Sequence, residues 1–129
     1  MDKLMSSTSI IIPVLNESLS VCELLSSLKK QSVLPDQIIF VDAGSTDNTQ
    51  AIIEKWWTHN RWDGTSLKII LSNKALPGKA RNVGIMCASS EWLLFLDAGI
   101  IPDYDWLEQL RNCIDKNTEI PAAFGSNTH

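Results

Sequence analysis

Two aspartates stand at the ends of apolar segments, and each is followed by Ala-Gly. Residues 40–45 read FVDAGS and residues 95–100 read FLDAGI, so Asp42 and Asp97 share one local context. A carboxylate in such a place can accept a hydrogen bond from a ligand N–H or supply oxygen to a metal ion. The glycine lets a ligand approach the backbone. Taken singly, each aspartate could equally be a turn-forming residue.

A second set of candidate ligand-binding residues carries positive charge. Lys79 and Arg81 lie in the stretch LPGKARNVGI, and Lys74 precedes it. These cations could form a solvated face. The Pro-Gly pair among them is typical of a shaped loop, which favours proximity to a phosphate group.

Apolar runs and helical patterns alternate along the chain and predict the elements that must position these residues. The runs lack the period of two seen in half-exposed strands, as expected for strands buried on both faces of a parallel sheet. They are SIIIPVLNE (9–17), QIIFVDAGS (37–45), LKIILSNK (67–74) and EWLLFLDAG (91–99). The order predicts a single α/β domain over residues 1–129, with an open, doubly wound, mostly parallel sheet. The half-fold of the Rossmann type gives the strand order 3-2-1-4.

Helix-period patterns fill the intervals between the runs. Ser20 and Glu23 can form a capping box at the first helix, and Asp47 stands three residues before Gln50 at the second. The expected buried faces are Val21, Leu24, Leu25 and Leu28; Ile52, Ile53 and Trp56; Ala80, Val83, Gly84 and Cys87; and Trp106, Leu107, Leu110 and Ile114. Trp62 has no helix face, which leaves both core packing and stacking on a sugar or base open.

Polar residues follow three of the four expected strands. Asn16 and Glu17, Asp42, and Asp97 each come directly after an apolar run. Because ligands of open α/β sheets bind at the carboxyl ends of the strands, we expect these residues along one rim. Pro13 cannot donate to a central ladder, so the first strand should stop near Ile12.

Composition and charge exclude several classes of protein. The chain is 44% apolar and 20% charged, and its formal charge of −4 with no basic block argues against a nucleic-acid polymer as partner. Three distant cysteines indicate reduced core residues, and the apolar N-terminal stretch is too short for a signal peptide or membrane span. We expect a cytoplasmic location, with attachment to a membrane surface left open. A dinucleotide-binding Gly-x-Gly-x-x-Gly turn and a Walker loop are both missing.

Four motifs in order resemble one known family. SIIIPVLNES, IIFVDAGSTDNT, LPGKARNVGI and EWLLFLDAGIIPDYDWLEQL closely resemble the N-terminal half of family 2 glycosyltransferases, over roughly residues 8–114. The resemblance implies the A-type glycosyltransferase fold and a nucleoside diphosphate sugar as donor. It also implies roles for individual positions. Pro13, Asn16 and Glu17 match the loop beside the nucleoside, and Asp42 matches the aspartate that accepts a base N–H, commonly of uracil. Lys79 and Arg81 match cations near the nucleotide.

The last motif departs from the family pattern. The resemblance implies that Asp97 is the first carboxylate of the Asp-x-Asp motif, which holds a divalent metal ion, Mg²⁺ or Mn²⁺, and the sugar-phosphate. Gly99 stands where the second acidic residue is expected, which puts the metal in doubt. Asp103 or Asp105 could reach in, or Lys79, Arg81 and a helix N-terminus could stabilise the leaving diphosphate without metal.

No residue of the sequence is a persuasive general base for sugar transfer with inversion. In the family that carboxylate and the acceptor pocket come from a C-terminal half, which the 129 residues do not include. We therefore expect a glycosyltransferase domain that binds a nucleotide sugar, most simply a UDP-sugar, for transfer to an unidentified sugar, lipid or protein acceptor. The alternative is a non-catalytic nucleotide-binding or assembly module derived from such an enzyme. An uncovered sheet edge would then favour a homo-oligomer.

Overall fold

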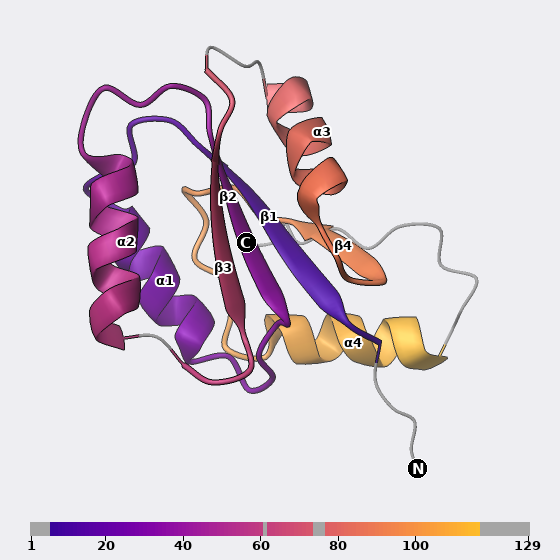
Figure 1. Ribbon diagram of the computed structural model, residues 1–129. Helices are drawn as coiled ribbons and strands as arrows, with labels where there is room; N and C mark the ends of the chain where they lie inside the picture. Colours follow the sequence, from indigo (N-terminus) through magenta and orange to yellow (C-terminus); the bar gives the residue numbers. More distant parts are fainter. Residues whose placement is uncertain (1–5, 61, 74–76, 117–129) are drawn as a thin grey trace.

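Strands and helices alternate along the chain in the computed structural model (Figure 1), which describes residues 6–60, 62–73 and 77–116. The elements are β1 (Thr8–Val14), α1 (Val21–Lys29), β2 (Gln37–Asp42), α2 (Thr49–Asn60), β3 (Ser66–Leu71), α3 (Pro77–Cys87), β4 (Trp92–Phe95) and α4 (Trp106–Lys116). None of the described helices is long and apolar enough to span a membrane.

The described strands form one parallel sheet in the order β3-β2-β1-β4, which confirms the predicted topology. Every residue of β2 is buried, as expected for a central strand. The expectation of burial on both faces is wrong for β3, where none of the six residues is fully buried, and for β4, where only Leu94 is. The reason is that β3 and β4 lie at the two edges of the described sheet, and each has a described strand on one side only.

Helices cover both faces of the sheet. Side chains of α1, α2 and α4 share one buried cluster with the sheet, in which Leu24, Ile53 and Leu107 are fully buried. On the opposite face α3 packs over β1 and β2, and Ala80 joins Ile11 and Ile39 in a second cluster. The predicted buried faces of the four helices are therefore confirmed in outline.

Close packing of α3 on the sheet depends on Gly84. A Cβ atom at this position would clash with the side chain of Ile11, whose Cγ1 would lie 3.3 Å away and whose Cγ2 would be closer still. The small-residue face predicted for this helix therefore lets its backbone approach β1.

Pro13 lies inside β1, so the expected end of the strand near Ile12 is wrong. The strand continues to Val14, and Pro13 is in register with Val41 of β2. The carbonyl of Ile11 accepts from Leu96 at 3.1 Å on the β4 side, whereas that of Val14 accepts from Ala43 at 3.0 Å on the β2 side. By this alternation the nitrogen of Pro13 points toward β4, which pairs with β1 only as far as Ile11. No ladder hydrogen bond is lost there.

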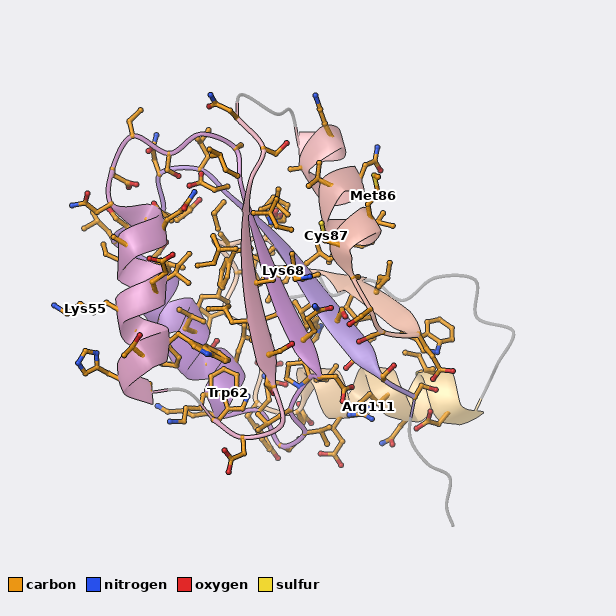
Figure 2. The ribbon with its side chains drawn as sticks, viewed as in Figure 1. Lys55, Trp62, Lys68, Met86, Cys87 and Arg111 are labelled. Carbon is orange, nitrogen blue, oxygen red and sulfur yellow. The ribbon has the colours of Figure 1, made fainter. Side chains whose placement is uncertain are left out.

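One further expectation is corrected. Ser20 makes no capping bond to α1; its hydroxyl donates to Glu17 Oε1 at 2.9 Å, because Ser20 belongs to the turn that begins at Glu17. Trp62 is partly buried and packs against the core cluster, as the first of its two open interpretations expects. Its ring lies beside the lower end of α2 in Figure 2, with its centroid 5.9 Å from that of Trp56 and 4.7 Å from that of Trp57.

Candidate nucleotide-binding edge

Asp42 ends β2, and turn residues hold its carboxylate in place. The chain turns back over the strand end, with Gly44 at a φ of 112°. Oδ1 of Asp42 accepts from the backbone N–H of Gly44 at 3.0 Å, and from the N–H and hydroxyl of Ser45, each at 2.8 Å. Oδ2 accepts from the Gln50 amide at 2.9 Å. The residue is only 2% exposed, so these bonds fix its orientation.

The same contacts set the charge of Asp42. Burial by itself would raise the pKa of this carboxyl group. Hydrogen bonds from the backbone and hydroxyl of Ser45, the amide of Gln50 and the backbone of Gly44 outweigh burial and lower the pKa below its ordinary value. Asp42 is therefore an ionised acceptor at neutral pH, which suits a ligand N–H donor.

Asn16 joins the turn after β1 to the turn after β2. Its φ is 56°, in the left-handed region that asparagine tolerates better than most residues. Its backbone N–H donates to the Ser45 hydroxyl at 2.8 Å, and its Oδ1 accepts from the backbone N–H groups of Thr46 at 2.8 Å and Asp47 at 3.2 Å. Asn16 thus lies within two hydrogen bonds of the Asp42 carboxylate.

Glu17 and Ser18 extend this link to the start of α2. The N–H of Glu17 donates to the Thr49 hydroxyl at 2.9 Å, and that of Ser18 donates to Asp47 Oδ2 at 3.1 Å. Asp47 Oδ1 accepts from the N–H of Thr49, the first residue of α2, at 3.0 Å. The expected cap position is off by one residue, because the carbonyl of Asn48 accepts the first helical bond, from Ile52 at 2.9 Å. The pKa of Asp47 falls from 3.8 to about 2, chiefly because the Thr49 hydroxyl also donates to it and then through the bonds from Ser18.

Asp97 follows β4, the strand adjacent to β1, and therefore lies at the same edge of the sheet. Its side chain is exposed, and its carbonyl accepts from the N–H of Ile100 at 3.1 Å. Pro13 lies at the same edge, near the carboxyl end of β1. The predicted gathering of strand-end residues along one rim agrees with the sheet order, although no described hydrogen bond joins Asp97 to Asn16 or Asp42.

Lys79 and Arg81 are exposed in the first turns of α3. Figure 1 shows this helix beginning at the end of the sheet where β2 and β3 stop. The two cations therefore lie toward the rim, and none of the described hydrogen bonds fixes either side chain to it. Lys74 lies outside the described residues.

Two residues of this edge were not predicted to belong to the site. Ser45 touches both Asn16 and Asp42, and Gln50 binds Asp42 rather than turning back to the helix start at Asp47. Their polar character in the stretch GSTDNTQ was the only available signal, since spacing does not say which carboxylate an amide will reach.

The described residues do not complete a metal centre. They contain no group of three His, Cys, Asp or Glu side chains that could hold an ion. At the position expected to carry a second carboxylate, Gly99 leaves open space, with no atom within 4 Å of where a Cβ would be. Because Mg²⁺ and Mn²⁺ depend on several oxygen ligands, Asp97 alone does not fit a resident metal.

A doubly wound parallel sheet defines an open α/β domain, a class in which ligands bind at the carboxyl edge of the sheet. Sequence comparison identifies the family of this domain, because the model of Glycosyl transferase family 2 matches residues 9–126. The chain therefore belongs to this family, which confirms the resemblance seen in its motifs.

Individual relatives agree with this assignment. The chain is 32% identical over 111 residues to the poly(ribitol-phosphate) beta-N-acetylglucosaminyltransferase TarS of Staphylococcus aureus, covering 84% of this chain and 19% of TarS. It is 34% identical to the amylovoran biosynthesis glycosyltransferase AmsB of Erwinia amylovora, covering 85% of this chain and 36% of AmsB. The chain thus spans about a fifth to a third of the length of these relatives.

Solved structures share the fold. Residues 1–349 of S. aureus TarS in complex with UDP-GlcNAc superimpose with a TM-score of 0.74 at 32% identity, over 87% of this chain and 32% of that one. A mannosyltransferase from Pyrobaculum calidifontis, in complex with GDP-Man and Mn²⁺, gives a TM-score of 0.79 at 22% identity, over 89% and 34%. The second likeness shows the fold alone. Together these structures confirm the A-type glycosyltransferase architecture.

Proposed function

We propose that this domain binds a nucleoside diphosphate sugar at the carboxyl edge of its sheet, with a uridine nucleotide as the preferred donor. The observation that carries the proposal is the buried, ionised carboxylate of Asp42 at the end of β2, held by four hydrogen bonds. An ionised acceptor fits a base that offers a ring N–H, as uracil does. The TarS structure with UDP-GlcNAc supports the same donor class.

The other rim residues receive complementary roles. Asn16 and Glu17 shape the turn beside the nucleoside, because their backbone groups are bonded to the turn after β2. Lys79 and Arg81 are exposed cations suited to a diphosphate, and Asp97 lies beside β1 where the sugar-phosphate would be. As part of a longer polypeptide like its relatives, the domain would supply the donor half of a sugar transfer that inverts the anomeric centre. The general base and the acceptor remain unassigned.

Calorimetric titration of the 129-residue chain with UDP, CDP and GDP tests the proposal. We expect UDP to bind more tightly than CDP. Asp42→Asn should weaken UDP binding by about tenfold or more, because a hydrogen bond to a charged group contributes roughly 1.5–3 kcal/mol. Asp36→Asn is a matched control, since Asp36 lies before β2 at the opposite end of that strand. Equal UDP binding by the wild type and Asp42→Asn would contradict the proposal.

A second candidate function is favoured by Gly99. A domain that keeps the base-recognition turn but lacks the second carboxylate could bind nucleotide without transferring sugar. Assaying donor hydrolysis at high protein concentration separates the two candidates. Turnover that is lost in Asp97→Asn would exclude the non-catalytic candidate, whereas tight UDP binding with no turnover would favour it.

A further inference from the structure

A groove lies between α1 and α2, which pack against each other on one face of the sheet (Figure 1). It is open to solvent, its wall is mostly apolar, and its volume is about 320 Å³. Small-molecule sites have volumes of about 300–1,000 Å³. The groove is lined by Cys22 of α1 and by residues of α2, which are Ile52, Lys55, Trp56, His59 and Asn60. None of these residues is fully buried, so a ligand can reach them.

The groove is elongated along α2. Its residues on this helix follow the spacing i, i+3, i+4, i+7, i+8 from Ile52 to Asn60, which places them in one stripe. At a rise of about 1.5 Å per residue, the stripe is roughly 12 Å long. The ring centroids of Trp56 and Trp62 are 5.9 Å apart, and this contact restrains part of the wall. A site elongated along a helix suits a linear chain better than a ring system.

Polar groups near the end of α2 are bonded within the protein. The Asn60 amide donates to the carbonyl of Trp56 at 3.0 Å. Nδ1 of His59 donates to the carbonyl of Lys55 at 2.9 Å. The ammonium group of Lys29 donates to the carbonyl of Asn60 at 2.7 Å. Because these groups are satisfied, the groove offers an occupant apolar contact more than hydrogen bonds.

The charge beside the groove is positive. Lys55 contributes an ammonium group, and no Asp or Glu of the described residues lines the groove. In Figure 2 Lys55 projects from α2 on the side away from the sheet, so its charged end lies in solvent while its stem lines the groove. Lys29 adds a second ammonium group beside Asn60. This local positive charge favours an anionic group, although the formal charge of the whole chain is −4.

We propose that the groove between α1 and α2 binds a single-chain carboxylate, whose apolar chain lies along Ile52 and Trp56 and whose carboxylate lies beside Lys55. Burial of the chain supplies the affinity, since each buried methylene contributes a factor of about four. The ammonium group selects the sign of the charge. The site is separate from the nucleotide-binding edge, because it extends from the first turn of α2 to the opposite end of that helix. The inference therefore does not depend on the proposed function.

Calorimetric titration of the 129-residue chain with decanoate tests the proposal, with every probe kept below its micelle concentration. Hexanoate has the same head group on a shorter chain, and decyltrimethylammonium has a similar chain with the opposite charge. We expect decanoate to bind about tenfold or more tighter than hexanoate. We also expect it to bind more tightly than decyltrimethylammonium, although the net charge of the protein favours the cation. Equal binding of the anionic and cationic decyl probes, or no binding of decanoate, would overturn the proposal.

Alkylation of the cysteines locates the bound probe. Cys22 lines the groove, whereas Cys87 lies in α3 and Cys113 in α4, and all three are free thiols. We expect saturating decanoate to slow the alkylation of Cys22 by iodoacetamide severalfold, as measured by mass spectrometry, and to leave the other two rates unchanged. An unchanged rate at Cys22, or equal slowing of all three, would place the probe elsewhere and contradict the assignment.

Lys55→Glu tests the charge selection, and Lys68→Glu is its matched control. Both variants change the net charge equally, and Lys68 is exposed on β3, outside the groove. We expect Lys55→Glu to weaken decanoate binding about fivefold or more, because an exposed ion pair is lost and repulsion replaces it. Lys68→Glu should bind decanoate as the wild type does. Equal weakening in both variants would show a general charge effect and exclude a role for Lys55. Thermal melts check folding, and Lys55→Gln, which removes only the charge, replaces Lys55→Glu if that variant does not fold.

A second copy of the chain is the competing occupant of this groove. Analytical ultracentrifugation at increasing protein concentration, with and without decanoate, separates the two possibilities. We expect the same sedimentation coefficient in both conditions. A dimer that decanoate dissociates would assign the groove to self-association and reject the carboxylate as its occupant.

Discussion

The backbone N–H of Asn16 donates to the hydroxyl of Ser45 at 2.8 Å and so ties the turn after β1 to the turn after β2. The Ser45 hydroxyl in turn donates to Asp42 Oδ1 at the same distance. The Ser45 hydroxyl thus connects Asn16, whose φ is 56°, to the buried carboxylate of Asp42. This connection links the two turns of the candidate nucleotide-binding edge.

Asn16 variants should separate backbone strain from side-chain bonding. Asn16→Ala and Asn16→Gly both remove the acceptor for Thr46 and Asp47, but only alanine keeps a Cβ at a φ of 56°. We expect urea denaturation to give a free energy of unfolding about 1 kcal/mol lower for the alanine variant than for the glycine variant. Equal values for the two variants would show that this position is not strained.

Asp47 should make the link between the two turns sensitive to acid. Its pKa is lowered from 3.8 to about 2 in the folded protein, so its ionised form stabilises the fold. That contribution is fully present above the unfolded pKa and is lost as pH falls through the folded one. We expect the carboxyl carbon resonance of Asp47 to titrate near the lower value, with the protection factors of the Ser18 and Thr49 amides falling over the same range. In Asp47→Asn these protection factors should no longer show that step, whereas titration of wild-type Asp47 at its ordinary pKa would contradict the prediction.

Gly84 should be intolerant of a side chain. Gly84→Ala forces a Cβ against Ile11 and should lower the free energy of unfolding by about 1–3 kcal/mol, the usual range for overpacking. Gly78→Ala is the control in the same helix, because a Cβ there meets no atom within 4 Å. Urea denaturation of both variants decides the matter: equal stability would mean that α3 does not approach β1 as closely as described.

Gly99→Asp should create metal dependence without disturbing the fold. A Cβ at this position would meet no atom within 4 Å, and the φ of Gly99 is outside the left-handed region. We expect an unchanged melting temperature and an affinity for Mn²⁺ in the presence of UDP that rises about tenfold or more, since the number of charged ligands tunes such sites. Gly99→Asn is the matched variant without the charge. An equal gain in both would assign the effect to something other than a second carboxylate.

Much of the fold could be predicted from the sequence because the patterns are local. The apolar runs and helix periods predicted the strand order, since right-handed crossovers leave few arrangements of such units. Burial failed as a guide for β3, because an edge strand can be as rich in Ile and Leu as a central one. Pro13 also misled, because its missing N–H matters only if the neighbouring strand that its nitrogen faces is still paired there, and the pairing of β1 with β4 ends at Ile11.

The candidate site was likewise predicted from the sequence only in part. The positions of Asn16, Asp42 and Asp97 after apolar runs were enough to predict a shared edge of the sheet. The roles of Ser45 and Gln50 were not predictable, because the same polar side chains could have formed local caps at α2. By itself the amino-acid sequence determined the family, the order of the elements and the side chains available at their ends. Only the tertiary structure decided which of them bond to one another, because a hydrogen bond depends on ångström-scale distances set by how two turns pack together.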